Sequence, residues 1–268
     1  MARTSSSGLT AAALEPAPVL ASYHEGVSAV CALAARFTGT DWDAPTPCAE
    51  WRAADLAGHL RCVADDYHEY LDHAPASRLA RLMAAGPRPD TLERKLARQN
   101  AAELAALPDV PPGEHVAAFA VSAREYASRL PAVWDLPHHR YREIVVTVAA
   151  MAGAAGAEWH LHAWDLASSA GLEHRPAEPA LVLAGWRAGM PQLQAAARDP
   201  GRPAGCGRSH GGLRSLRRAG AGLAVRRGRR SPVSASRLRV LLHVDWQRAR
   251  ECADPWHTLL LATGRAPQ

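Results

Sequence analysis

Apolar residues recur at helical spacing through most of the chain before residue 198. The spacing predicts helices over residues 18–37, over a segment after Trp51 that carries residues 56–70, and over residues 91–107, 114–130, 142–170 and 179–197. Residues 134–141 are predicted as a loop, and only residues 144–148 and 239–243 have the character of strands. Long helices without strand alternation are typical of helix bundles. We therefore expect an all-α protein, an up-and-down four-helix bundle.

The predicted helix over residues 142–170 is apolar nearly all round, which is typical of a central helix. One of its faces changes from apolar to polar midway, and the residues on that face are Ile144, Val148, Met151, Ala155, Glu158, His162 and Asp165. A carboxylate and an imidazole one turn apart are costly on a buried face unless something compensates them, and a divalent metal compensates both. The alternative is a solvated surface pair of Glu158 and His162, with Asp165 in the last turn.

A third candidate ligand lies in the preceding half of the chain. His59 follows Leu56 by three residues and precedes Val63 by four, so it lies at the margin of an apolar helix face. It is either a packed boundary residue or a residue that points into the bundle. Together with Glu158 and His162 it would complete a set of two histidines and one glutamate, which is a common catalytic zinc arrangement with a fourth position left open.

Charge divides the chain into unequal parts. Residues 199–268 contain 14 Arg and 4 acidic side chains, for a net charge of +10, whereas residues 1–198 carry −5. We expect a disordered N-terminal tail over 1–17, a metal-binding helical bundle over 18–198, and a poorly ordered or degenerate region over 199–268. The Arg- and Gly-rich stretch 201–230 has neither helical nor strand periodicity. It lacks the interleaved aromatics of single-strand nucleic-acid binders, which argues against a nucleic-acid-binding tail. We favour a frameshifted segment, because a GC-rich gene read in a shifted frame yields Arg, Gly, Ala and Pro in such numbers.

Other features of the composition exclude several classes of protein. The five cysteines are odd in number and form no C-x-x-C pair, which argues against a disulfide framework and a thiolate zinc site. The N-terminus has no continuous apolar segment of the kind found in signal peptides, and no run approaches twenty apolar residues. We therefore expect a soluble, cytoplasmic protein without a membrane partner, either a monomer or a homodimer.

Two separated motifs resemble a known family. Residues 42–51 read WDAPTPCAEW and residues 55–60 read DLAGHL, which is similar to the opening signature of the mycothiol-dependent maleylpyruvate isomerase N-terminal domain. Residues 158–167, EWHLHAWDLA, resemble the second signature of that family. The resemblance covers about residues 18–197 and implies a DinB-like four-helix bundle. It implies that His59, Glu158 and His162 bind a divalent metal, usually zinc.

The resemblance also implies a reaction. Mycothiol, a low-molecular-weight thiol, would act as cosubstrate in the cis-trans isomerisation of maleylpyruvate to fumarylpyruvate. A related bundle could instead transfer the thiol to an electrophile, or bind metal as a stress or regulatory protein without catalysis. Full-length members have a smaller α+β C-terminal domain that contributes a basic residue to the active site. We recognise no counterpart after Arg198, so the resemblance implies that residues 199–268 are a frameshifted remnant of such a domain.

Four neighbouring features receive subsidiary interpretations. Asp165 is expected to orient His162 as a hydrogen-bond acceptor, or to cap the helix end. His160 points to a different face from His162, so we interpret it as structural or exposed. Cys48 is interpreted as a packed thiol. The pair of His138 and His139 is expected to be exposed on the loop before the metal-binding helix.

Overall fold

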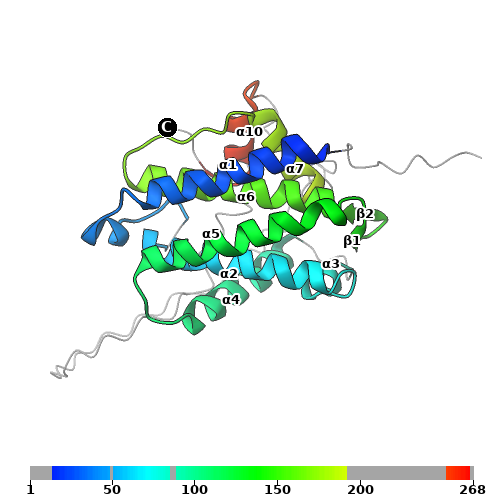
Figure 1. Ribbon diagram of the computed structural model, residues 1–268, viewed down its shortest axis with the longest axis horizontal. Helices are drawn as coiled ribbons and strands as arrows, with labels where there is room; N and C mark the ends of the chain where they lie inside the picture. The colour runs from blue at the N-terminus through cyan, green and yellow to red at the C-terminus, as the bar shows by residue number, and fades with distance from the viewer. Residues whose placement is uncertain (1–13, 49–50, 85–88, 192–251, 266–268) are drawn as a thin grey trace, which may run out of the picture.

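The structure, a computed structural model, describes residues 14–48, 51–84, 89–191 and 252–265. Four long helices dominate it, namely α1 (Pro16–Ala34), α2 (Ala53–Asp72), α5 (Pro112–Arg129) and α6 (Val148–Ser169). Helix α6 packs against α1 and α2, and α5 packs against the same two helices, so the four enclose one core (Figure 1). The prediction of an all-α, four-helix bundle is confirmed.

An aromatic cluster at the centre of the bundle joins all four helices. The indole of Trp159 on α6 contacts the rings of Tyr23 on α1, Tyr67 on α2 and Phe119 on α5, with centroids 6.0, 5.7 and 4.9 Å away. The interplanar angles of 71° to 84° correspond to edge-to-face packing. Each such pair contributes about 0.5–1.5 kcal/mol beyond the burial of its area. The cluster therefore fixes the relative positions of the helices that carry the candidate ligands.

Helix α6 is central, as its sequence predicts, and small residues allow another helix to lie close to it. Helix α7 (Pro179–Gly189) packs against α6 where Gly185 faces Gly153. A Cβ atom on Gly185 would lie 2.8 Å from the Cα atom of Gly153, so the close approach requires glycine. Helix α10 (Pro255–Ala262) packs in turn against α7, and Figure 1 shows it in red beside that helix.

The segment before α6 is a β-hairpin, so the prediction of a loop over residues 134–141 and a helix from residue 142 is wrong. Strand β1 (Pro137–Tyr141) pairs antiparallel with β2 (Ile144–Thr147), and Arg142 in the turn has a φ of 53°. The β-branched residues of β2 favour a strand, and their apolar run continues into α6 without a change that periodicity could detect. The side chain of Thr147 accepts a hydrogen bond from the Ala150 amide and caps α6.

His138 and His139 are both buried in this hairpin, which corrects the expectation that they are exposed. The strand register shifts between Pro137 and His139, as in a β-bulge, and a bulge can turn two consecutive side chains to the same side. Their Nδ1 atoms lie 2.9 Å apart, so one ring donates a hydrogen bond to the other. The pair is part of the hairpin packing.

Shorter elements complete the described part of the chain. They are the 3-10 helices η1 (Gly39–Asp43) and η2 (Leu130–Ala132) and the helices α3 (Arg78–Ala84) and α4 (Pro89–Ala106). Helix α4 packs against α2, and α3 packs against β1. Helix α4 matches the helix predicted over 91–107, whereas α3 was not predicted.

The predicted boundaries between the bundle and its two flanking regions differ from those in the structure. Helix α1 begins at Pro16, inside the predicted tail, and residues 1–13 lie outside the described residues. Most of the predicted irregular region 199–268 and its strand-like run 239–243 also lie outside the described residues. Residues 252–265 do not, and they contain α10. No helix within the described ranges has the length and apolar character needed to cross a membrane.

Candidate metal centre

Three side chains from two helices converge at one end of the core. His59 on α2 and Glu158 and His162 on α6 each offer one ligand atom, and these atoms lie within 4.8 Å of one another. Nε2 of His162 is 3.9 Å from Oε1 of Glu158. In a tetrahedral zinc site, ligand atoms about 2.0–2.2 Å from the metal are roughly 3.3–3.5 Å apart. Small side-chain movements would therefore bring these atoms to the spacing that zinc requires.

His59 is held in an apolar environment. Its neighbours Leu56 and Leu60 are fully buried on α2, its own exposed fraction is 5%, and the indole of Trp51 packs against its ring with centroids 4.5 Å apart. Burial, together with the nearby His162 and Arg265, holds the pKa of His59 well below its ordinary value. Nδ1 of His59 is buried and has no hydrogen-bond partner among the described residues. A neutral imidazole with an orphaned buried nitrogen fits the donor set of a metal.

Glu158 is the most accessible of the three candidate ligands, because 27% of its side chain is exposed. Its Oε2 atom accepts a hydrogen bond of 3.0 Å from the hydroxyl of Tyr67 on α2. Burial raises the pKa of Glu158, while His162 and the Tyr67 hydrogen bond act in the opposite direction. Since Oε2 is occupied by Tyr67, Oε1 is the oxygen available to a cation. The exposure of Glu158 also gives the site a side from which a ligand can approach.

His162 is oriented by Asp165, one turn further along α6. Nδ1 of His162 lies 2.9 Å from Oδ2 of Asp165, so the hydrogen bond expected from the sequence is present. An ionised carboxylate can only accept, so Nδ1 carries the hydrogen and Nε2 keeps its lone pair. That lone pair lies on the side of Glu158. This is the pattern of metal-binding histidines, which usually donate their other N–H to an acceptor.

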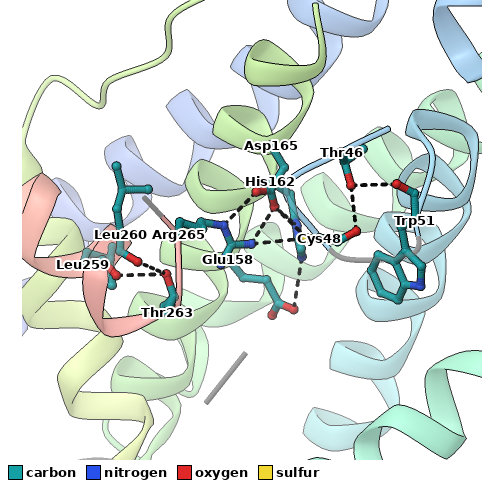
Figure 2. Close-up of polar contacts among 10 residues, drawn as sticks. All are labelled: Thr46, Cys48, Trp51, Glu158, His162, Asp165, Leu259, Leu260, Thr263 and Arg265. Atoms are coloured by element: carbon teal, nitrogen blue, oxygen red, sulfur yellow. Dashed lines mark hydrogen bonds and ion pairs between the residues drawn. The ribbon is translucent and has the colours of Figure 1, made fainter. Parts of the chain in front are cut away.

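Arg265 reaches Asp165 from the C-terminal part of the chain. Its Nε atom donates to Oδ1 at 2.8 Å and its Nη2 atom to Oδ2 at 2.5 Å, which makes a two-pronged ion pair (Figure 2). Both side chains are almost completely buried. Although burial alone raises the pKa of Asp165, Arg265 and His162 hold that pKa well below its usual range. The carboxylate is therefore charged whenever the protein is folded at neutral pH.

The end of α10 explains how Arg265 comes to point at α6. Gly264 follows the helix with a φ of 77°, a left-handed conformation that glycine adopts without strain. The Arg265 amide donates to the Leu260 carbonyl at 2.8 Å, and the Gly264 amide donates to the Leu261 carbonyl at 3.2 Å. These two bonds form a Schellman motif, which ends the helix and reverses the chain. Figure 2 shows Arg265 leaving α10 in the direction of Asp165.

Cys48 is a further partner of Asp165. Its Sγ atom donates to Oδ2 at 3.1 Å, and Thr46 shapes the loop by donating from its hydroxyl to the carbonyls of Cys48 and Trp51. Burial, reinforced by the negative charge of Asp165, holds the pKa of Cys48 well above its ordinary value, so it is a thiol. Figure 2 shows this loop facing Asp165 and His162.

Cys48, His162 and Asp165 also have ligand atoms within 4.8 Å of one another. That group is a poorer cation site, because Asp165 already receives hydrogen bonds from Cys48, His162 and Arg265. The guanidinium also supplies the positive charge that the carboxylate needs. The set of His59, Glu158 and His162 is thus the better site for a metal.

Two other candidates from the sequence lie elsewhere. His160 is buried on the side of α6 that faces α1, where its Nε2 atom lies 3.0 Å from the carbonyl oxygen of Ser22. The pair of His138 and His139 belongs to the hairpin. Neither belongs to the two candidate metal-binding groups found among the described residues.

Two residues at the centre were not predicted from the sequence. Tyr67 follows His59 by eight residues on the same helix. In the sequence, only its hydroxyl indicates that it can make a polar contact. Arg265 lies in the region 199–268, which was predicted to be poorly ordered. A usable signal was the dipeptide at Asp254 and Pro255, because an Asp cap followed by Pro is typical of a helix start. The Asp254 side chain does accept from the Trp256 and His257 amides.

Comparison with known proteins identifies the family of the chain. A family model described as the mycothiol maleylpyruvate isomerase N-terminal domain matches residues 23–167, just over half of the chain. The match includes His59, Glu158, His162 and Asp165. Searches of curated proteins and of solved structures found no match. The chain belongs to the family of the mycothiol maleylpyruvate isomerase N-terminal domain.

Proposed function

We propose that this protein is a metal-dependent, mycothiol-linked isomerase that converts a cis double bond conjugated to a carbonyl, as in maleylpyruvate, to the trans form. The observation that carries the proposal is the convergence of His59, Glu158 and His162 within 4.8 Å, inside the part of the chain that the family model matches. Two imidazoles and a carboxylate with an accessible side make up a donor set typical of catalytic zinc.

The ligand atoms follow from the hydrogen bonds. Nε2 of His162 and Oε1 of Glu158 are free for a cation because Asp165 and Tyr67 occupy the other atoms of these two groups. His59 contributes a ring nitrogen. A divalent cation bound there would favour the deprotonated, nucleophilic form of a thiol or water in its open position.

The surrounding residues hold the ligands rather than react. Tyr67 limits Glu158 to one free oxygen, Asp165 fixes the tautomer of His162, and Arg265 keeps Asp165 charged. Arg265 is thus a positioning residue, which acts on the centre through Asp165. It comes from the C-terminal part of the chain, outside the residues that the family model matches.

The thiol cosubstrate would supply a nucleophile that adds to the conjugated double bond, leaving a single bond that rotates before the thiol is eliminated again. Each bond that forms in this addition is broken in the elimination, so the reaction needs no oxidant or reductant. A reduced thiol is available in the cytoplasm, and we propose that the protein acts there.

A second candidate is a mycothiol S-transferase. It is favoured by the extent of the family match, which covers the metal-binding domain and leaves the substrate undetermined. The same centre would activate the same thiol, but the thiol would remain on the electrophile. A metal-binding bundle without catalytic activity is the third possibility.

The test is turnover by the zinc-loaded full chain with mycothiol, on maleylpyruvate and, in parallel, on a simple electrophile. The isomerase produces fumarylpyruvate without consuming thiol, and the activity is lost in Glu158→Gln and His162→Gln. A transferase consumes one thiol per product. No turnover of either substrate would refute both enzymatic proposals. His73→Gln is the matched control, since its side chain is 65% exposed at the end of α2.

A further inference from the structure

A second pair of histidines lies on the opposite side of α6 from the proposed metal centre. His160 is two residues from both Glu158 and His162, so on the helix it points away from them. Its Nδ1 atom lies 3.1 Å from Nε2 of His174, in the loop between α6 and α7. The two rings are almost parallel, with an interplanar angle of 15°. The two ring nitrogens are therefore within hydrogen-bond distance of each other.

The tautomer of His160 follows from its other contact. Nε2 of His160 is 3.0 Å from the carbonyl oxygen of Ser22 on α1, and a carbonyl can only accept. Nε2 therefore carries the hydrogen, and Nδ1 has its lone pair directed at His174. Nδ1 of His160 thus accepts a hydrogen bond from Nε2 of His174, and a cation that replaced this shared hydrogen would meet a histidine whose other N–H is already held by a backbone carbonyl, as in many metal ligands. Buried among α1 and α6, this ring is already fixed in place.

We propose that His160 and His174 bind a second divalent transition-metal ion of the zinc type. The observed separation of 3.1 Å is close to the ~3.3 Å between two nitrogens that bind one tetrahedral zinc ion. Binding requires only that the hydrogen of His174 moves from Nε2 to Nδ1, so that both rings remain neutral. Water, or a carboxylate that rotates into place, would supply the remaining ligands.

The surroundings favour a cation and allow it to enter. His174 is only partly buried, so the pair can be reached from solvent. The carboxylate of Glu25 on α1 acts electrostatically on His174 and holds the same loop by accepting from the Ala177 amide at 2.8 Å. The neighbouring cation, Arg175, is paired with Asp254 at 2.8 Å, which reduces its repulsion of a bound ion.

An ion bound by His160 and His174 would affect how α10 packs. The loop that carries His174 contacts α10 twice, through the ion pair of Arg175 with Asp254 and through the edge of His174 against Trp256. Helix α10 leads to Arg265 at the other metal centre. An ion on His160 and His174 would join α1, α6 and this loop, and would thereby stabilise the docking of α10.

The experiment is a zinc titration of the metal-free full chain, with bound zinc and the melting temperature measured at each step. The wild type and the exposed-site control His73→Gln should bind two equivalents, and the second should raise the melting temperature. His174→Gln should bind one equivalent, and a further equivalent should leave its melting temperature unchanged. The melting transition itself shows that the variant is folded.

A variant of the other centre separates this proposal from the proposed function. His59→Gln should lose one equivalent of bound zinc and keep the equivalent that depends on His174. The double variant His59→Gln/His174→Gln should bind no zinc. A His174→Gln protein that binds as many equivalents as the wild type would overturn the second site, whatever the outcome for catalysis.

Discussion

Replacement of Arg265 by Gln tests whether the C-terminal segment is an integral part of the proposed metal centre. The substitution leaves Asp165 charged and fully buried without its two-pronged partner. Breaking a buried ion pair by removing one partner typically costs about 3–5 kcal/mol, because the remaining charge is uncompensated. We expect a loss of this size in the free energy of unfolding, measured by urea denaturation of the metal-free protein. Undocking of α10 would limit the loss, and faster amide exchange in α10 would reveal it.

Arg175→Gln is the matched control, because it removes an ion pair that also involves the α10 region but is partly exposed. The side chains of Arg175 and Asp254 are 49% and 33% exposed, and pairs of this kind contribute about 0–1 kcal/mol. The control should therefore cost less than 1 kcal/mol. If Arg265→Gln were no more costly than Arg175→Gln, the buried pair would not hold α10 against α6, and the positioning role of Arg265 would be refuted.

The pH dependence provides a second readout of the same substitution. In the wild type the pKa of Asp165 is held well below its usual range, so its contribution to stability is present above pH ~4 and is lost only as the pH falls through that lowered pKa. Without Arg265, the burial that raises the pKa of Asp165 is opposed only by His162, so the pKa should rise. The cost of Arg265→Gln should then be largest at neutral pH and become smaller as the pH falls and the carboxyl group takes up a proton.

Three further predictions concern other parts of the molecule. Tyr67→Phe should weaken zinc binding about 10- to 100-fold in a chelator competition, since the hydroxyl holds Glu158; unchanged affinity would remove Tyr67 from the centre. Gly185→Ala should cost about 1–3 kcal/mol because its Cβ would meet the Gly153 backbone, whereas Gly113→Ala, with open space around it, should be tolerated; equal effects would contradict the close approach. Burial lowers the pKa of His139 to about 3, below its unfolded value, so the free energy of unfolding should decrease as the pH falls from ~6.5 to about 3. The decrease should be less steep in His139→Gln, and identical slopes in the two proteins would refute this.

Local patterns were enough to predict the bundle. Helix α6 could be identified as central from its apolar residues on all sides, and 18 of its 22 residues are buried. The hairpin before it escaped prediction because the apolar residues of β2 continue directly into those of α6. The Thr147 cap marks the boundary between β2 and α6, and the turn at Arg142 and the strand pairing have no periodic signature.

The centre itself was predictable where its residues share a helix face and unpredictable where they do not. The spacing of Glu158, His162 and Asp165 predicted that they lie together, and the position of His59 at the margin of an apolar helix face, supported by the family resemblance, added the third ligand. Arg265 is 100 residues from Asp165, and nothing local to either residue connects them. A hydrogen-bond partner at that separation follows from tertiary packing alone.

The most direct test of the central claim is a crystal structure of the zinc-loaded protein, with an anomalous difference map recorded at the zinc edge. We predict a peak about 2.0–2.2 Å from a ring nitrogen of His59, Oε1 of Glu158 and Nε2 of His162. The absence of a peak among these three residues, or a peak on Cys48 and Asp165 in its place, would contradict it.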